Sequence, residues 1–458
     1  MKSDIKFGTD GWRAITDKVF TEENVRIAVL AIAKYVYEDF GADKKIIIGY
    51  DPRRKADFFA KESAEILKGL GFEVLISDRV IPTPVLAFQA KELHACALMF
   101  TASHNPPEYL GLKFIPDYAG PATSEITDKI TANLGAEIKP FRPNGSIKVV
   151  DFAPAYFKHL ETLIDFDKIK SHAGKIIFDG LYSATIGYFD KFLETHGIKF
   201  ESLHLHHDVN FGGGMPEPKP KYLTELIGLC KCAVGFANDG DGDRFGVINE
   251  NGEYVTPNEI IAILLIHLKK HKNYKGALVK TVGASLMLNI LAEKLGIELI
   301  ETAVGFKHVG EAMRKFNPII AGEESGGLSI QNHIPEKDGI LANLLVLEAM
   351  AYENKTLVEL QKDLKAFIGK EFINDRVDKH LENFDEVKPF LEKVKALCAL
   401  GNLKVSKTDL TDGVKLFFED GESWILARPS GTEPLLRIYF ETTTNEKMNF
   451  LQNEMAKI

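Results

Sequence analysis

The chain has 458 residues, of which 45% are hydrophobic and 26% are charged, the balance of an ordinary soluble globular protein. At roughly 100–200 residues per domain, this length predicts three or four domains with a cleft between them. The formal net charge of -9, without any block of Lys or Arg, argues against nucleic acid and anionic membranes as partners. The longest aliphatic run, residues 260–266, is too short to span a bilayer, and no apolar signal segment opens the chain, so we expect a cytoplasmic protein.

Helix and strand signals alternate through most of the chain. Apolar residues at helical spacing after Thr21 precede a buried strand over 45–50, a helix over about 57–69 and a strand over 72–76, which together form a βαβ unit. The order of strand, helix and strand returns over 175–205 and again over 277–300. We therefore expect three similar α/β units with mixed sheets.

The pattern changes at about residue 371. A helical stretch over 381–400 precedes strands over 414–418 and 424–427, joined by a turn at 419–422, and then a strand over 435–440 and a closing helix. This order is typical of a smaller α+β domain. We expect domain boundaries at residues 1–147, 148–253, 254–370 and 371–458.

The first of four polar loops is Thr101-Ala102-Ser103-His104-Asn105-Pro106, which follows an apolar strand over 95–100. The prolines after Asn105 prevent a helix, so the turn presents Ser103 rigidly toward the carboxyl edge of a sheet. Serine needs an activating base or charge to act as a nucleophile, and His104 could move a proton beside it. No Gly-x-Ser-x-Gly motif of acyl transfer occurs here, and an ordinary polar turn is the alternative.

The second loop is Asn238-Asp239-Gly240-Asp241-Gly242-Asp243-Arg244. Three carboxylates at alternate positions repel one another unless they share a cation, so this loop predicts a divalent metal site. Together with Glu250 the aspartates also fall at positions 1, 3, 5 and 12 of an EF-hand. However, Arg244 stands where that motif needs Gly, and the flanks resemble strands instead of helices.

The third and fourth loops suit a sugar and an anion. In Gly322-Glu323-Glu324-Ser325-Gly326-Gly327 the carboxylates can accept hydrogen bonds from sugar hydroxyls, although a solvated acidic turn is an equal alternative. In Arg428-Pro429-Ser430-Gly431-Thr432-Glu433-Pro434 the guanidinium, two hydroxyls and backbone N–H groups can bind phosphate, with a polar hairpin as the alternative. The four loops together supply a serine, a cation site, a sugar site and an anion site.

These motifs, in this order, resemble those of the α-D-phosphohexomutases, which include phosphoglucomutase, phosphomannomutase and phosphoglucosamine mutase. The resemblance begins at Phe7-Gly8-Thr9-Asp10-Gly11-Trp12-Arg13, includes Val304-Gly305-Phe306-Lys307-His308, and ends at the Arg428 loop. It implies four domains, three α/β and one α+β, around a central cleft. It also implies an enzyme with bound Mg²⁺, a hexose 1,6-bisphosphate as activator and intermediate, and a small-molecule sugar phosphate as substrate, in a monomer or homodimer.

The resemblance further implies a role for each matched residue. The catalytic residues would be Ser103, which carries the phosphoryl group, with His104, Lys113 and Arg13. The metal ligands would be Ser103, Asp239, Asp241 and Asp243. The residues that bind substrate would be Arg244, Lys280, Lys307, His308, Glu323, Ser325, Arg428, Ser430, Gly431 and Thr432.

Two stretches depart from the family pattern. Leu110 stands where the family usually has Asn before Gly111, on the approach to Lys113. The sugar loop reads Glu-Glu-Ser-Gly-Gly, where phosphoglucosamine mutases typically have Glu-Gln-Ser-Gly-His, and this favours a plain hexose. Residues 333–339 are similar to phosphoglucomutase sequences, so interconversion of glucose 1-phosphate and glucose 6-phosphate is the expected reaction. Phosphomannomutase, dual specificity and phosphoglucosamine mutase are the alternatives within the family, and a silent sugar-phosphate sensor or a metal-dependent phosphatase are those outside it.

Overall fold

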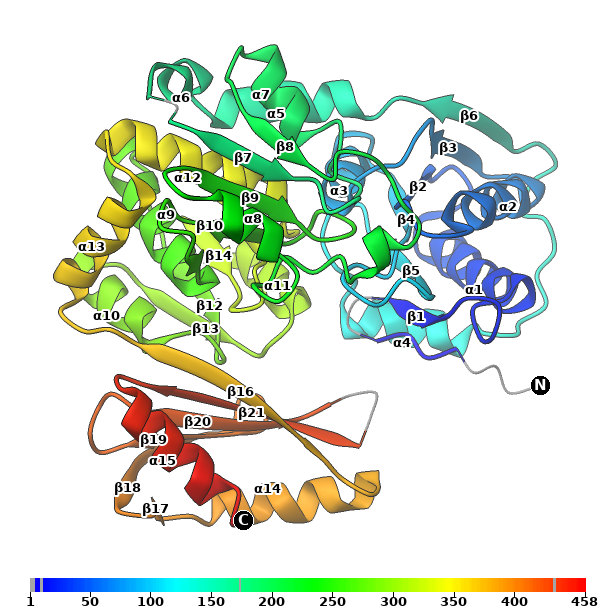
Figure 1. Ribbon diagram of the computed structural model, residues 1–458. Coiled ribbons are helices and arrows are strands. Elements are labelled where there is room, and N and C mark those ends of the chain that lie inside the picture. Colours follow the sequence, from blue (N-terminus) through cyan, green and yellow to red (C-terminus); the bar gives the residue numbers. More distant parts are fainter. Residues whose placement is uncertain (1–4, 9–10, 173, 431–433) are drawn as a thin grey trace.

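The structure, a computed structural model, describes residues 5–8, 11–172, 174–430 and 434–458. Figure 1 shows three α/β domains that lie together in the upper part of the molecule and a smaller fourth domain below them. Each domain contains one sheet, mixed in the first three domains and antiparallel in the fourth. The expected fold class is therefore confirmed.

The sheet of the first domain has the strand order β1-β5-β4-β2-β3-β6. Its strands are β1 (Trp12–Ile15), β2 (Ile46–Tyr50), β3 (Glu73–Ser77), β4 (Cys96–Phe100), β5 (Tyr109–Ile115) and β6 (Ser146–Val150). β1 and β5 pair antiparallel with their neighbours, whereas the other four strands are parallel. The helices are α1 (Glu22–Phe40), capped by the Thr21 hydroxyl, α2 (Ala56–Gly69), α3 (Thr83–Glu92) and α4 (Ser124–Ala132).

The second and third domains repeat this plan with fewer strands. The second sheet has the order β11-β10-β9-β7-β8, and the third has the order β13-β12-β14-β15. The strands of the second are β7 (Ile176–Asp179), β8 (Glu201–Leu203), β9 (Val234–Asn238), β10 (Phe245–Ile248) and β11 (Tyr254–Val255). The strands of the third are β12 (Leu278–Thr281), β13 (Leu299–Thr302), β14 (Ile320–Gly322) and β15 (Leu328–Ile330).

Helices pack around these two sheets. Those of the second domain are α5 (Ala153–Leu163), α6 (Phe166–His172), α7 (Phe189–Thr195) and α8 (Thr224–Leu229). Those of the third are α9 (Pro257–His271), α10 (Leu286–Leu295), α11 (Phe306–Phe316), α12 (Gly339–Glu353) and α13 (Leu357–Ile368). Within the described ranges, no helix has the length and the apolar run that crossing a membrane requires.

The fourth domain is an antiparallel sheet of order β16-β21-β20-β19-β18-β17, with α14 (Val387–Lys395) and α15 (Asn445–Met455). Its strands are β16 (Ile373–His380), β17 (Ala399–Leu400), β18 (Leu403–Asp409), β19 (Val414–Phe418), β20 (Trp424–Pro429) and β21 (Leu435–Thr442). The domain has a hydrophobic core of its own, whereas one large core continues from the first domain through the second into the third. A small cluster around Val282, Trp424 and Leu426 joins the third and fourth domains.

The three α/β domains place their polar loops at equivalent positions. In each sheet an inner strand, β4, β9 or β14, pairs parallel with one neighbour, and the strand that follows it, β5, β10 or β15, returns antiparallel on its other side. The Ser103, Asp239 and Glu323 loops make these three connections. Because carboxyl ends of parallel strands lie at one edge of a sheet, the plan presents each loop at such an edge.

The structure differs from the sequence-based predictions at several boundaries of domains, helices and strands. The boundary expected after residue 147 falls inside β6, all five residues of which pair with β3, and the boundary after 253 separates β11 from its partner β10. The helix expected over 381–400 is limited to α14 (Val387–Lys395), and the strand expected over 199–205 is limited to β8 (Glu201–Leu203). Two strands that were not expected, β16 and β18, expose most of their residues, so their sequences lack the apolar alternation of a half-buried strand.

Candidate active site

The loop between β4 and β5 holds Ser103 in a strained, buried turn. Ser103 is 1% exposed and has a φ of 51°, a left-handed conformation that costs a non-glycine residue on the order of 1 kcal/mol. The Thr101 hydroxyl accepts a hydrogen bond from the Ser103 N–H at 2.8 Å. Such strain persists only where the surroundings enforce it, and it is often found at functional sites.

Arg53, which follows β2, binds the main chain of this turn. Its guanidinium donates to the carbonyls of Ser103 at 2.6 Å, Asn105 at 2.7 Å, Pro106 at 2.8 Å and Tyr109 at 3.0 Å. These bonds enforce the conformation that presents the serine.

Asp51 completes the support for the serine turn. Its carboxylate accepts from Arg53 Nε at 3.1 Å and from the Thr101 hydroxyl at 2.6 Å. Burial raises the pKa of Asp51 to about 6, although the Arg53 charge and the Thr101 hydrogen bond oppose this shift. A buried arginine and carboxylate therefore fix the serine loop from inside the first domain.

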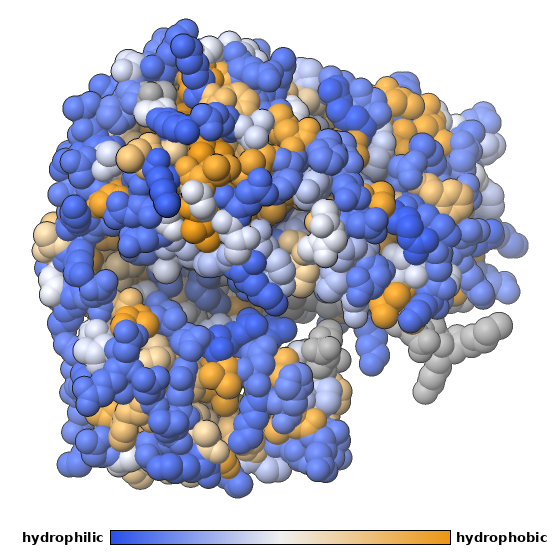
Figure 2. Space-filling view, in the orientation of Figure 1, coloured by the Kyte–Doolittle hydropathy of each residue, from blue (hydrophilic) through white to orange (hydrophobic). Residues whose placement is uncertain are grey.

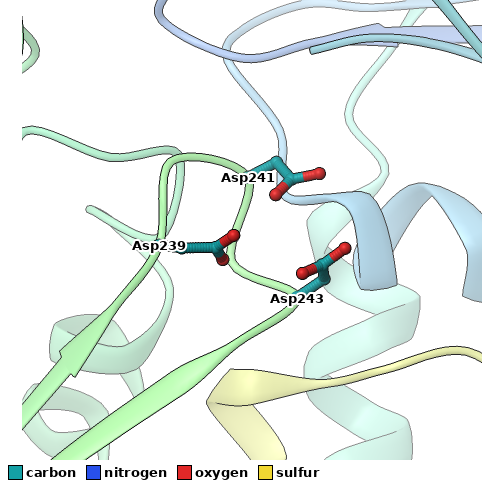
Figure 3. Close-up of side chains that lie close together, drawn as sticks. All are labelled: Asp239, Asp241 and Asp243. Carbon is teal, nitrogen blue, oxygen red and sulfur yellow. The ribbon is translucent and has the colours of Figure 1, made fainter. Parts of the chain in front are cut away.

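The loop between β9 and β10 brings three carboxylates to the serine. Asp239, Asp241 and Asp243 are all 0% exposed, and one ligand oxygen from each lies within 4.8 Å of the others. Figure 3 shows the three carboxylates gathered on this loop. The Ser103 hydroxyl donates to Asp239 Oδ2 at 2.7 Å, so the first and second domains meet here as expected. A Cβ on Gly240 would lie 2.6 Å from the Ser103 carbonyl, so only glycine allows this approach.

Two lysines from different domains neutralise part of this acidic cluster. Lys113 on β5 donates to Asp241 at 2.8 Å and to Asp243 at 3.0 Å, and Lys337 forms an ion pair with Asp243 at 3.0 Å. Burial acts to raise the pKa of Asp243, but Lys113, Lys337 and Arg244 outweigh it and hold that pKa well below its ordinary value. Burial and the two neighbouring carboxylates raise the pKa of Asp239 well above its ordinary value. The charge of Arg244 opposes this rise at Asp239 but does not overcome it.

The carboxylates fit a divalent cation. One buried oxygen each of Asp241 and Asp243 has no hydrogen-bond partner among the described residues, whereas the second oxygen of each is satisfied. A buried, unsatisfied carboxylate oxygen is costly unless a cation binds it, and hard cations such as Mg²⁺ prefer such oxygens. Asp239, Asp241 and Asp243 are therefore the residues that could hold such an ion, as the family resemblance implies.

Three further side chains from the sequence analysis lie around the serine. His104 Nδ1 is 3.3 Å from the Ser103 hydroxyl, and burial, with the charges of Arg244 and Arg13, lowers the pKa of His104 well below its ordinary value. Arg13 donates to the Asn105 side chain at 2.8 Å. The Arg244 N–H donates to Asp239 Oδ1 at 2.9 Å. Burial acts to lower the pKa of the Arg244 guanidinium, but the acidic neighbours outweigh burial and raise that pKa. His104 therefore contacts the serine oxygen, and Arg13 and Arg244 bind Asn105 and Asp239 beside it.

The loop between β14 and β15 presents Glu323 and Ser325. The Glu323 carboxylate accepts from the Ser325 hydroxyl at 3.1 Å and from the Gly305 N–H at 2.9 Å. Burial raises the pKa of Glu323, opposed by the charge of Lys337. Arg244 lies close enough to affect both Glu323 and Asp243, so the sugar loop and the metal loop share one electrostatic environment.

The fourth domain contributes Arg428 at the end of β20. Its Nε forms an ion pair with Asp412 Oδ2 at 2.9 Å, and Ser430 is 5% exposed with its N–H bonded to the Leu435 carbonyl at 2.8 Å. Gly431 and Thr432 lie outside the described residues. Figure 2 shows a recess on this face between the fourth domain and the domains above it.

Two expected substrate ligands, Lys280 and Lys307, bind groups of the protein itself. Lys280 is 0% exposed, donates to the carbonyls of Ala284 and Ser285 at 3.1 and 3.2 Å, and pairs with Glu301 at 3.1 Å, so the protein itself satisfies this ammonium. Lys307 on α11 donates to the Ser124 hydroxyl of the first domain at 3.0 Å. Burial lowers the pKa of His308, a shift that the charge of Lys307 reinforces.

The structure also places residues in the site that the sequence analysis did not identify. They are Asp51, Arg53, Thr83, Lys337 and Asp412. Asp51 and Arg53 follow the parallel strand β2, so the rule that selected the Ser103 loop applies to them as well. Thr83, which donates to Asp241 at 2.6 Å, begins α3, and Asp412 lies between β18 and β19. Neither residue stands in a motif, so only the tertiary structure could reveal them.

Comparison with protein families identifies all four domains. The matches are to the phosphoglucomutase/phosphomannomutase alpha/beta/alpha domains I (residues 4–140), II (154–252) and III (256–367), and to the C-terminal domain of the same proteins (373–458). They follow one another in the order of the four sheets and cover nearly all of the chain.

Relatives and solved structures agree with the domain matches. A phosphoglucomutase/phosphomannomutase from Thermococcus kodakarensis is 28% identical over 96% of this chain and 95% of its own length. A phosphoglucosamine mutase from Methanococcus vannielii is 32% identical over 89% of this chain and 91% of its own length. A crystal structure from Thermus thermophilus with a provisional phosphomannomutase name is 32% identical, has a TM-score of 0.88, and covers 100% of this chain and 99% of that one.

The four matched domains, the similar full-length relatives, and a serine that meets a buried acidic triad lead to one assignment. The chain belongs to the phosphoglucomutase/phosphomannomutase family of α-D-phosphohexomutases, isomerases that transfer a phosphoryl group within a sugar phosphate.

Proposed function

We propose that this enzyme interconverts glucose 1-phosphate and glucose 6-phosphate through a phosphoserine at Ser103 and a bound glucose 1,6-bisphosphate. The observation that carries the proposal is the 2.7 Å contact between the Ser103 hydroxyl and Asp239 in a buried triad of carboxylates. Phosphoryl transfer depends mainly on positioning and on neutralising charge, so the serine needs cations around it. Mg²⁺ on Asp239, Asp241 and Asp243 would supply charge that stabilises the transferring phosphoryl group.

The protein's own groups supply the remaining chemistry. Arg53 fixes the turn that presents the serine, while Arg13, Lys113 and Arg244 place positive charge around it. His104 is kept neutral by burial and lies 3.3 Å from the serine oxygen, so it can accept or return the proton there.

The substrate would be held at both ends. Glu323 and Ser325 would bind sugar hydroxyls, and Arg428 and Ser430 would hold the phosphate that does not react. Because Arg428 lies on the fourth domain, movement of that domain would let the bisphosphate turn over between the two transfers.

Gly327 in the sugar loop is an argument for a plain hexose as substrate. A Cβ on Gly327 would lie 2.4 Å from Cδ and 2.7 Å from Cγ of Lys337, whose ammonium is held by Asp243. The histidine that phosphoglucosamine mutases typically have at this place in the motif would therefore displace Lys337 from the metal loop. This arrangement favours a plain hexose over an amino sugar.

Glucosamine phosphate is a second candidate substrate. Several full-length relatives bear the name phosphoglucosamine mutase, such as those from Methanococcus vannielii and Alkaliphilus oremlandii. Glu324 also places a second carboxylate in the sugar loop, where it could attract an ammonium group. However, the Thr281 hydroxyl already donates to Glu324 at 2.6 Å, which reduces its availability.

One assay series tests the substrate. The 1-phosphates of glucose, mannose and glucosamine are compared with Mg²⁺ and a trace of the matching 1,6-bisphosphate. We expect kcat/KM for glucose to exceed that for glucosamine by about tenfold or more. The reverse order would reject the glucose assignment while leaving the mutase chemistry in place.

A second measurement tests the phosphoserine. Intact-mass analysis should find one added phosphate that disappears from Ser103→Ala and is lost on incubation with hexose monophosphate. Release of inorganic phosphate with every turnover would instead identify a phosphatase, and absence of any turnover would identify a sugar-phosphate sensor.

A further inference from the structure

Charged side chains of the fourth domain bind main-chain groups of the third domain. Lys415 donates to the Val282 carbonyl at 2.6 Å, and Glu441 accepts from the Leu286 N–H at 2.8 Å. Both side chains are buried, at 2% and 0% exposure, beside Trp424. In Figure 1 the fourth domain lies below β12 and β13, and Val282 and Leu286 both follow β12. These two contacts dock the domain.

Asp412 makes a third contact of the same kind, with one difference. Its Oδ2 accepts from the Val304 N–H of the third domain at 3.0 Å and pairs with Arg428 Nε of the fourth domain at 2.9 Å. One oxygen atom therefore joins the proposed phosphate-binding arginine to the neighbouring domain. The side chains of Asp412 and Arg428 are 20% and 15% exposed, so this contact lies nearer to solvent than the other two.

The turn that Asp412 holds also leads directly to the sugar loop. Val304 donates to Asp412, and the next residue, Gly305, donates to Glu323 at 2.9 Å. Two consecutive amides thus bind one carboxylate from the fourth domain and one from the sugar loop. Glu323 in turn accepts from Ser325 at 3.1 Å. A continuous series of contacts runs from Arg428 to Ser325.

We infer that Asp412 is a positioning residue that couples the orientation of Arg428 to the placement of Glu323. The inference rests on the proposed function, in which Arg428 holds phosphate and Glu323 holds the sugar. The charge of Asp412 attracts the Arg428 guanidinium without a hydrogen bond at Nε, and an orientation favoured before phosphate binds lowers the conformational entropy lost on binding. The same carboxylate fixes the 304–305 turn, so the sugar loop keeps its donor when the fourth domain is docked. Asp412 therefore makes both ends of the substrate site depend on one interdomain contact.

Two substitutions at Asp412 separate these contacts. Asp412→Asn retains an oxygen that can accept from Val304 but removes the charge that pairs with Arg428. We expect it to raise KM for glucose 1-phosphate about fivefold with kcat within about twofold, the range of a partly exposed ion pair. Asp412→Ala removes both contacts, and we expect a similar rise in KM with a fall in kcat of about tenfold, because Glu323 is no longer fixed by Gly305.

Asp409→Asn is the matched control. It removes the same charge from the end of β18, where Asp409 accepts from the Thr411 N–H at 2.7 Å within its own turn. We expect KM and kcat of this variant to stay within about twofold of the parent enzyme. Circular dichroism and the thermal unfolding temperature establish that each variant folds. Kinetic constants of Asp412→Ala that equal those of Asp409→Asn would overturn the inference.

A double-mutant cycle tests whether Asp412 acts through Arg428. We expect Arg428→Ala to raise KM, and Asp412→Asn to add little in that background, since contacting residues are not additive. Fully additive effects would overturn the coupling while leaving the phosphate role of Arg428 intact. An unchanged KM in Arg428→Ala would instead overturn that phosphate role, and the inference with it.

Discussion

Arg53 offers a strict test of how the serine turn is held. Arg53→Met removes a buried guanidinium that bonds four carbonyls of the loop and pairs with Asp51 at 3.1 Å. Both partners of the pair are 0% exposed, and removing one partner of a buried pair costs about 3–5 kcal/mol. For a cooperative unit that spans the first three domains, that loss lowers the unfolding temperature by roughly 4–6 °C.

The loss should also depend on pH in a defined direction. Asp51 has a pKa of about 6 with Arg53 beside it, above its ordinary value of 3.8. Without Arg53 this pKa rises further, because the guanidinium charge opposes the effect of burial. The folded variant then holds a proton that the unfolded chain releases, so its stability falls as pH rises from about 4 through the folded pKa. The difference from the parent enzyme should be largest near pH 8 and smaller near pH 5.

Activity should fall as well, because the turn around Ser103 loses its anchor. A displacement of about 1 Å of a reacting group costs on the order of 100-fold in rate. Mutase activity is followed by a coupled dehydrogenase assay, and unfolding by circular dichroism at pH 5 and pH 8. Adding Asp51→Asn to Arg53→Met should recover stability at pH 8, since it removes the unpaired carboxylate, but should not recover activity.

Arg54→Met is the control for Arg53. Arg54 is the adjacent arginine, but its side chain is 52% exposed and pairs with Asp17 at 2.8 Å at the surface. Its loss should change the free energy of unfolding by less than about 1 kcal/mol. If Arg53→Met matched this control in both stability and rate, the proposed support of the serine turn would be wrong.

Three further predictions concern the chemical centre. Ser103→Ala should lower mutase activity by at least about 1,000-fold with an unchanged unfolding temperature, and retained turnover would contradict the phosphoserine. Chelation with EDTA should abolish activity and lower the unfolding temperature, because Asp239, Asp241 and Asp243 then repel one another. Added Mg²⁺ should restore both, and full activity in EDTA would exclude a metal role. His104→Gln should lower kcat by about 100-fold or more with little change in KM, the size expected for lost proton transfer, and an unchanged kcat would assign the proton to another group.

Strand patterns were sufficient to predict the main site loops. Inner strands such as β4 and β9 are buried on both faces, so their sequences are continuous apolar runs that end at a polar loop. Parallel strands present such loops at the carboxyl edge of each sheet, whereas the family resemblance implied that Ser103 and the aspartates meet. The contact between Ser103 and Asp239 confirms that part of the prediction.

Leu110 illustrates how a departure from the family pattern can leave the site unaffected. It is 0% exposed in β5, where side chains alternate between the two faces of the sheet. It lies an odd number of positions before Lys113, so the two side chains lie on opposite faces. Lys113 therefore reaches Asp241 and Asp243 although the residue before Gly111 is unusual.

Contacts between distant segments were beyond sequence reasoning. Arg53 lies 50 residues before Ser103, and Asp412 lies 108 residues after Val304, so neither pairing follows from spacing. β16 is an edge strand with polar residues on both faces, which removes the alternation by which strands are recognised. The sequence consequently did not predict β16.

Because the hydrophobic interior is divided into separate cores, we expect the domains to unfold, and their functions to be lost, in a defined order on heating. One core runs through the first three domains, so we expect them to unfold together, although the first domain also has a second core. The fourth domain has its own core and can open alone once the Trp424 patch and the contacts of Lys415, Glu441 and Asp412 break. A molecule in that half-open state retains its serine and carboxylates but has lost Arg428 and the means to retain a bisphosphate. With Ser103 as the proposed phosphoserine, moderate warmth should therefore turn the isomerase into a slow hydrolase, because the phosphoryl group then passes to water instead of returning to the sugar.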